Sequence, residues 1–227
     1  MRLQLMKRSP NFPRAALAVV ALLGACGASA PADGDGADGD ARAWTIGPIV
    51  RGRNYSEGVP LHPSPSRGGG WHIDLPQAPG SLHYVTFRHG SLAGKRRIVM
   101  RYRIDADRGV RIHPYKGGPA FASVITLYFQ RGGDNWSGRG RFETYRWYAT
   151  FASKMPIVPG EHVMVAPLNG RWTAVGASTA GTNPAAFQAA VAGADQVGFV
   201  LGGGDGYGHG VYATGRARLT VTDFRIE

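Results

Sequence analysis

The stretch RIVMRYRI, residues 97–104, alternates apolar side chains with mostly basic ones. One face of an extended chain would carry the apolar residues Ile98, Met100, Tyr102 and Ile104. Successive side chains of a strand point to opposite faces of its sheet. The stretch therefore predicts a strand of an antiparallel sheet with one face buried and the other face in water.

Further strand-like runs, separated by Gly- and Pro-rich segments, lie on both sides of this stretch. ASVITLYFQ, residues 122–130, is apolar on both faces, which is typical of a central strand. FETYRWYATF, residues 142–151, places Tyr145, Trp147, Ala149 and Phe151 on one side. The pair Asn169-Gly170 predicts a tight hairpin turn between the runs EHVMVAPL and RWTAV.

One helix and one strand irregularity are also expected. TNPAAFQAAVAG predicts a helix with Asn183 as its N-cap, Pro184 in its first position and Gly193 at its end. In the closing run ARLTVTDFRIE the apolar phase slips by one residue at Thr222-Asp223, which predicts a β-bulge.

About nine to eleven short strands with one helix predict an all-β sandwich or barrel. The ending DQVGFVLGGG…ARLTVTDFRIE resembles the last two strands of a galactose-binding-like jelly roll, the fold of many carbohydrate-binding modules. The resemblance covers the end of the chain closely and the rest by strand count alone. It implies a jelly-roll β-sandwich and makes carbohydrate the first ligand to consider.

The first 25 residues have the order of a secretory signal peptide: a basic segment, an apolar run, and small residues. The run from Ala15 to Ala25 is too short to span a bilayer, which needs about 20 residues. It ends in LLGAC, which resembles a bacterial lipobox and implies that Cys26, the sole cysteine, carries a lipid. Gly27 follows instead of aspartate, which implies the outer membrane in a Gram-negative cell. An ordinary signal peptide with a chance cysteine is the alternative.

Residues 26–43 contain four aspartates among small residues and no large apolar side chain. They predict a flexible tether, which leaves residues 44–227 as the folded domain. A calcium-binding loop starting at Asp33 fails because positions 37, 38 and 44 have the wrong residues. No cofactor is therefore predicted, although a structural calcium ion elsewhere stays open.

The folded domain is strongly basic, with 21 Lys and Arg against 11 Asp and Glu, a net charge of +10. Such a domain attracts polyanions. For an anchored envelope protein the expected partners are a carbohydrate or another anionic envelope polymer, and the membrane through its lipid, with no nucleic acid. An arginine-rich proteome would explain the same charge without any partner.

A glycine-rich stretch, GFVLGGGDGYGHGVYATG, occupies residues 198–215. It matches neither a phosphate-binding nor a dinucleotide-binding motif, and His209 has no second metal ligand beside it. The stretch predicts a connection between strands, and the alternative is one wall of a ligand site.

Residues 131–154 are the segment richest in polar, charged and aromatic side chains. Within it, Trp136 is predicted in a loop beside Asp134 and Asn135. Sugar rings stack on indoles, their hydroxyls bond to carboxylates and amides, and arginines meet carboxylate or phosphate. For each aromatic residue the alternative is a place in the core. The candidate ligand-binding residues are Trp136, Asp134, Asn135, Arg139, Arg146, Trp172, Tyr207 and His209.

No catalytic residue is assigned, because the acidic residues form no recognisable pair and no nucleophile motif is present. We therefore expect a lipid-anchored envelope protein that binds carbohydrate, including anionic polysaccharide, without catalysis. A polysaccharide lyase or glycosidase is the enzymatic alternative, and a converging cluster of His, Tyr and Arg, or two facing carboxylates, would favour it. A structural lipoprotein without a small ligand is the third alternative.

Overall fold

The computed structural model describes residues 40–117, 120–151 and 153–227. The predicted signal peptide, Cys26 and most of the tether lie outside the described residues. Residues 41–43, at the end of the predicted tether, form a 3-10 helix, η1 (Ala41–Ala43), in which Ala41 is buried. No helix in the described part of the chain is long and apolar enough to cross a membrane.

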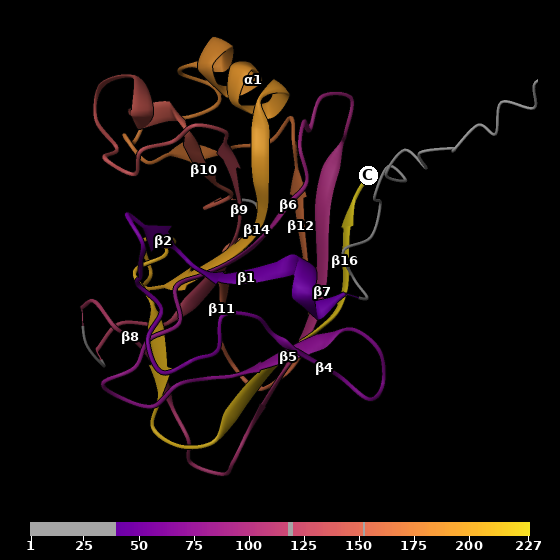
Figure 1. The fold of residues 1–227 in the computed structure, drawn as a ribbon, viewed down its shortest axis with the longest axis vertical. Helices are drawn as coiled ribbons and strands as arrows, with labels where there is room; N and C mark the ends of the chain where they lie inside the picture. Colours follow the sequence, from indigo (N-terminus) through magenta and orange to yellow (C-terminus); the bar gives the residue numbers. More distant parts are fainter. Residues whose placement is uncertain (1–39, 118–119, 152) are drawn as a thin grey trace, which may run out of the picture. The chain divides into compact units, whose positions relative to one another are not determined.

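Two antiparallel sheets make up most of the domain (Figure 1). The seven-stranded sheet has the order β1-β6-β14-β9-β10-β13, with β11 paired to β9. Its strands are β1 (Trp44–Gly47), β6 (Tyr84–Arg88), β9 (Val124–Arg131), β10 (Arg146–Tyr148), β11 (Met155–Pro156), β13 (Thr173–Ala174) and β14 (Ala194–Gly202).

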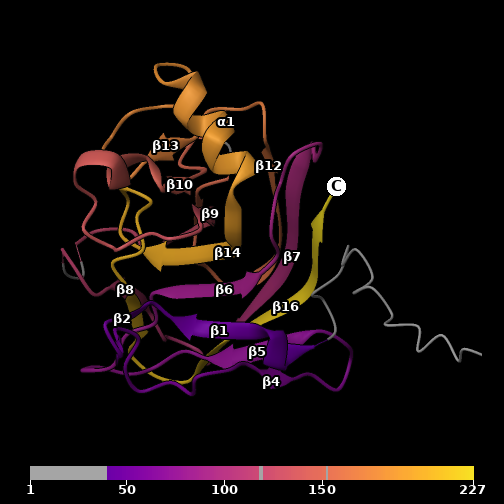
Figure 2. The same cartoon turned by 45° about the horizontal axis from the view of Figure 1, so that its top comes forward.

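The five-stranded sheet has the order β12-β7-β16-β5-β4. Its strands are β4 (Ser64–Pro65), β5 (Trp71–Asp74), β7 (Arg97–Ala106), β12 (Gly160–Pro167) and β16 (Ala217–Ile226). Two small ribbons pair β2 (Ile49–Val50) with β3 (Arg53–Asn54) and β8 (Ile112–Pro114) with β15 (Val211–Ala213). The remaining elements are the 3-10 helix η2 (Gly140–Thr144) and the helix α1 (Pro184–Ala192), which lies at one end of β14 (Figure 2).

The connectivity of the long strands is that of a jelly roll. In chain order, β5, β7, β12 and β16 belong to one sheet, and β6, β9, β10 and β14 belong to the other. Every connection among these eight strands except β9 to β10 therefore passes from one sheet to the other. Their order within the sheets is β12-β7-β16-β5 and β6-β14-β9-β10, which is the arrangement of a jelly roll. The predicted fold class is confirmed.

The inner faces of both sheets enclose one aromatic core. Trp44, Trp71, Trp147 and Trp172 are fully buried within it. The alternation predicted for residues 97–104 is confirmed, since Ile98, Met100, Tyr102 and Ile104 are all buried in β7. This single core holds the two sheets together and leaves their outer faces available for other roles.

Three local predictions are also confirmed. β9 lies inside the seven-stranded sheet, as its two apolar faces indicated. The helix α1 begins after Asn183, whose side chain accepts a hydrogen bond from the amide of Ala186. The pairing of β16 with β7 shifts register between Val221 and Asp223, where the bulge was expected.

The predicted hairpin at Asn169-Gly170 is wrong. The amide of Gly170 does donate to the carbonyl of Pro167 in a tight turn. However, β12 pairs with β7 over eight residues, while β13 pairs with β10 in the other sheet. The turn transfers the chain between sheets because each strand has a better partner elsewhere.

The strand count and the segment at 142–151 also differ from expectation. The described residues contain sixteen strands, because two-residue strands leave no periodic pattern in a sequence. Residues 140–144 form η2 and β10 ends at Tyr148, so Phe151 is 57% exposed and does not share the buried side of Trp147.

Candidate functional site

The outer face of the seven-stranded sheet carries a row of buried tyrosines. Tyr84 on β6, Tyr128 on β9 and Tyr148 on β10 all point away from the shared core and form a separate cluster with Val200. Trp136 and Tyr207 pack against this cluster from two loops. The tyrosines are thus enclosed between the sheet and the loops around residues 132–139 and 203–210.

Hydrogen bonds link the polar atoms of this cluster. The hydroxyl groups of Tyr84 and Tyr148 lie 2.8 Å apart, and the Tyr128 hydroxyl donates to Gln130 Oε1 at 2.9 Å. Gln130 Nε2 donates in turn to Asp134 Oδ2 at 3.0 Å. Desolvation raises the pKa of Tyr84, Tyr128 and Tyr148, so all three hydroxyl groups stay protonated at neutral pH.

A buried ion pair fixes the loop that contains Trp136. Arg146 Nε lies 2.9 Å from Asp134 Oδ2, with side chains only 9% and 0% exposed. Arg146 Nη2 donates to the carbonyl of Trp136, and Asp134 Oδ1 accepts from the amide of Trp136. Burial raises the pKa of Asp134, and the adjacent guanidinium opposes that rise. Both polar groups of the Trp136 backbone are therefore held by one pair of side chains.

Trp136 itself has an unusual backbone conformation, with a φ of +65°. A bulky residue in the left-handed region carries strain that the surrounding contacts must overcome. Its half-buried indole lies 4.9 Å from the guanidinium carbon of Arg146 and 5.5 Å from the Tyr84 ring, edge to face. These contacts fix the orientation of the ring before any ligand binds.

A groove of about 410 Å³ runs beside this indole. Its floor is β6, where Tyr84, Thr86 and Arg88 occupy successive positions on the outer face. Gly47 of β1 pairs with Tyr84, and Gly198 of β14 pairs with Thr86. Gly47 lines the groove without adding a side chain to it, whereas an added Cβ at Gly198 would collide with the backbone oxygen of Val85.

The groove presents polar groups opposite the indole. Thr86 Oγ1 donates to Gln196 Oε1 at 3.2 Å, and the half-buried Thr45 lies across the floor from Thr86. Arg88 lies at the end of β6 with its side chain 83% exposed and only a loose ion pair, at 3.6 Å, to Asp195. The groove thus combines an aromatic wall, neutral hydrogen-bonding groups and one available cation.

Several predicted residues lie in or behind this groove. Trp136 lines it directly, while Asp134 and Arg146 lie behind the indole and are paired to each other. The expectation that Asp134 and Arg146 contact a ligand is therefore corrected to a positioning role. Asn135 and Arg139 are exposed on the same loop, and Asn135 Oδ1 accepts from the amide of Ser137.

The other predicted residues lie outside the groove. Trp172 is fully buried, and its Nε1 donates to the carbonyl of Pro167, so it belongs to the core and not to a binding surface. Tyr207 packs edge-on against Tyr148 with ring centroids 4.8 Å apart. His209 lines a different hollow with Lys116 and Phe121.

The glycine-rich loop supports the tyrosine cluster. An added Cβ at Gly208 would collide with the Tyr84 ring, and one at Gly210 would come within 2.6 Å of His83 Nε2. His83 Nδ1 and the Gly208 carbonyl lie within hydrogen-bond distance, at 3.2 Å, and burial lowers the pKa of this histidine. Glycine is required at positions 208 and 210 because the backbone there lies directly on these two rings.

Sequence reasoning missed the floor of the groove. The signal was present in SLHYVTFRH, where Tyr84, Thr86 and Arg88 alternate with the core residues Val85 and Phe87. The groove is completed by Thr45 and Gly47 of β1 and Gln196 of β14, which lie far from β6 in the sequence.

No group of three or more potential metal ligands occurs among the residues that the structure describes. No protein-family model matches the chain, and no curated protein matches it either.

Proposed function

We propose that this domain binds carbohydrate without catalysis, in the groove beside Trp136. The observation that carries the proposal is the strained and preoriented indole at the wall of a polar groove. Backbone strain of this kind persists where surrounding contacts enforce it, and it concentrates at functional sites. Here Asp134, Arg146 and Tyr84 all enforce the position of one half-exposed ring.

The chemistry of the groove suits a sugar. The indole offers an apolar face for the C–H side of a pyranose ring. Thr45, Thr86 and Gln196 offer donors and acceptors for hydroxyl groups. Arg88 offers a guanidinium to an acidic sugar, which is the role that the buried Arg146 cannot fill.

Two observations favour binding over catalysis. The described residues that line the groove include no aspartate or glutamate, whereas a glycosidase needs a carboxylate pair. A lyase needs a base, but burial raises the pKa of Tyr84, the tyrosine among the described lining residues, so that its hydroxyl stays protonated at neutral pH. The arginine and tyrosines that converge here therefore shape and support the wall.

We also propose that a lipid anchor holds this carbohydrate-binding domain at the cell envelope. The support is the lipobox-like LLGAC and the sole cysteine, Cys26. Two or more acyl chains hold a protein at a membrane far more firmly than one. Metabolic labelling with a fatty-acid analogue tests the anchor: the chain should be labelled and Cys26→Ser should not, and an unlabelled wild-type chain would refute it.

The binding proposal is tested on a glycan array with the purified chain, Trp136→Ala and Phe151→Ala. Phe151 is an exposed aromatic residue outside the groove, so its loss controls for nonspecific stickiness. We expect binding that Trp136→Ala reduces at least about tenfold, or about 1.4 kcal/mol, and that Phe151→Ala retains. No glycan binding, or equal loss in both variants, would refute the proposal.

A further inference from the structure

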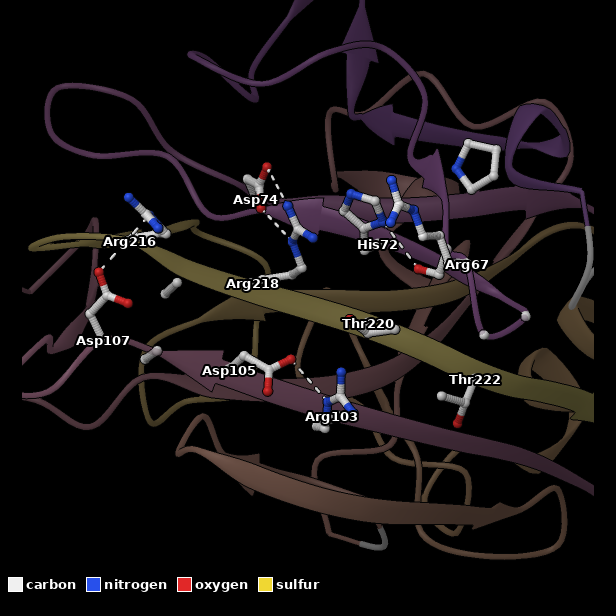
Figure 3. Close-up of a pocket in the computed structure, with 16 residues that line it drawn as sticks. Arg67, His72, Asp74, Arg103, Asp105, Asp107, Arg216, Arg218, Thr220 and Thr222 are labelled. Atoms are coloured by element: carbon white, nitrogen blue, oxygen red, sulfur yellow. Dashed lines mark hydrogen bonds and ion pairs between the residues drawn. The ribbon is translucent and has the colours of Figure 1, made fainter.

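A second hollow, of about 910 Å³, lies on the outer face of the five-stranded sheet (Figure 3). β16 forms its floor, and residues of β5 and β7 flank the floor on either side. Residues 65–69, which lead from β4 toward β5, border it as well. The Trp136 groove belongs to the other sheet, so the two hollows are separate.

Strand pairing places His72 and Arg103 on either side of the shorter residue Thr220 in this hollow. Thr220 of β16 pairs with His72 of β5 on one side and with Arg103 of β7 on the other. Figure 3 shows Arg67 beside His72, with Thr220 between this pair and Arg103. The threonine leaves open the space that its longer neighbours surround.

The charges in the hollow differ in how firmly they are paired. Arg218 donates two hydrogen bonds to Asp74, at 2.6 and 3.1 Å, and this pairing lowers the pKa of Asp74. Arg103 contacts Asp105 on its own strand at 2.9 Å, but both side chains are half exposed, and such pairs contribute little. Arg67 has no ion-pair partner in the described part of the chain.

His72 adds a further polar group. Its Nδ1 lies 3.0 Å from Ser66 Oγ, which orients the ring and leaves Nε2 for another partner. Arg67, Arg103, His72 and Thr220 thus lie together in the lining of the hollow, with groups that can donate hydrogen bonds to an anion. The described residues that line the hollow include no Phe, Tyr or Trp, so recognition here depends on charge and hydrogen bonds and not on stacking.

We propose that these four residues bind an oxyanion group, a sulfate, phosphate or carboxylate, carried by an anionic polysaccharide. Charge-assisted hydrogen bonds from arginine are the strongest available to such a group. The floor formed by residues 217–222 is about 17 Å long at the usual rise per strand residue, long enough for a chain of sugars. The inference is independent of the Trp136 groove.

The test compares the full chain with Arg67→Gln, Arg103→Gln and the control Arg108→Gln. Arg108 is exposed, lies outside the residues that line the hollow, and its loss removes the same charge. The probes are heparin, polygalacturonate, neutral dextran and inorganic phosphate, at near-physiological salt. Heparin carries sulfate groups and polygalacturonate carries carboxylates, so the two polymers distinguish which oxyanion group binds. Inorganic phosphate distinguishes binding of a free ion from binding of a polymer.

We expect the chain to bind at least one acidic polymer and not dextran. Arg67→Gln and Arg103→Gln should each weaken binding about fivefold, while Arg108→Gln changes it less than about twofold. Equal losses in all three variants would indicate bulk charge and overturn the site. The proposed site would also be overturned if neither acidic polymer bound. The same holds if inorganic phosphate displaced the polymer when both were present at equal concentrations of negative charge.

Trp136→Ala should leave the binding that depends on Arg67 and Arg103 unchanged, whereas it weakens binding in the other groove at least about tenfold. If Trp136→Ala removed acidic-polymer binding, the second site would be wrong and the first groove would hold the polymer. Vesicles containing anionic lipid are the last probe of the binding experiment. Binding to them that depends on Arg67 and Arg103, with neither polysaccharide bound, would reassign the hollow to a lipid headgroup.

Discussion

At the scale of single residues, the decisive feature is how Asp134 and Arg146 hold Trp136. Both were predicted to bind ligand because acidic and basic residues near a loop tryptophan are typical of sugar sites. The structure buries them behind the indole instead. Sequence could identify the cluster of residues but not their depth, because burial here depends on packing against Tyr84 of β6, which lies about 50 residues earlier in the chain.

Removing one partner of this pair should destabilise the domain. In Asp134→Ala the guanidinium of Arg146 stays buried without its carboxylate, which costs about 3 kcal/mol. We expect a lower free energy of unfolding in urea. Glycan affinity should fall too, since Trp136 loses the acceptor of its backbone amide. A variant with wild-type stability and affinity would contradict the positioning role.

Arg88 should determine which sugars the groove accepts. Arg88→Gln removes the one exposed cation of the groove and keeps its hydrogen-bonding ability. We expect about a fivefold loss of affinity for acidic glycans and unchanged affinity for neutral ones, measured by calorimetry. Equal effects on both classes would show that Arg88 acts through structure and not through its charge.

At the scale of elements, the glycine-rich loop supports the tyrosine cluster. Its composition suggested several binding motifs, none of which fitted. At Gly208 and Gly210 the requirement is the close approach of the backbone to the rings of Tyr84 and His83. That requirement involves β6, more than a hundred residues earlier, so no local pattern could show it.

Substitutions at two glycines of this loop should differ sharply. Gly208→Ala places a Cβ against the Tyr84 ring and 2.8 Å from Val200 Cβ, so overpacking should cost about 1–3 kcal/mol. Gly204→Ala meets no atom within 4 Å and should change the unfolding free energy little. Thermal and urea unfolding of both variants would check this, and equal effects would contradict it.

The same loop should make stability depend on pH through His83. Burial lowers the pKa of this imidazole below its ordinary value of 6.5, so the folded state favours the neutral form. The unfolded chain then gains protons first as pH falls, and stability decreases from about pH 6.5 down to the folded pKa. The loss of Tm between pH 7.5 and 5.5 should be larger for wild type than for His83→Gln. Identical pH profiles would contradict this assignment.

At the scale of the whole molecule, the jelly roll was predictable and its details were not. Alternation in residues 97–104 and the ending of the chain identified strands that form long ladders, such as β7 and β16. The hairpin at Asn169-Gly170 was wrong because a local turn signal does not reveal which distant strand pairs with β12. The groove escaped prediction for the same reason, since β1, β6 and β14 all contribute residues to its lining.

One shared core should make the domain unfold as a unit. Trp44, Trp147 and Trp172 lie in the same cluster as residues of the five-stranded sheet. Tryptophan fluorescence and far-UV circular dichroism should therefore report one coincident urea transition. Two separated midpoints would show that the sheets unfold independently.

One measurement tests directly whether a bound glycan covers Trp136. Four of the five tryptophans, at positions 44, 71, 147 and 172, have no exposed surface, and Trp136 alone is partly exposed. Acrylamide quenching of fluorescence therefore reports on Trp136. We predict that glycans selected on the array protect the fluorescence at concentrations that match their affinity. If saturating glycan left the quenching unchanged, glycan binding at Trp136 would be contradicted.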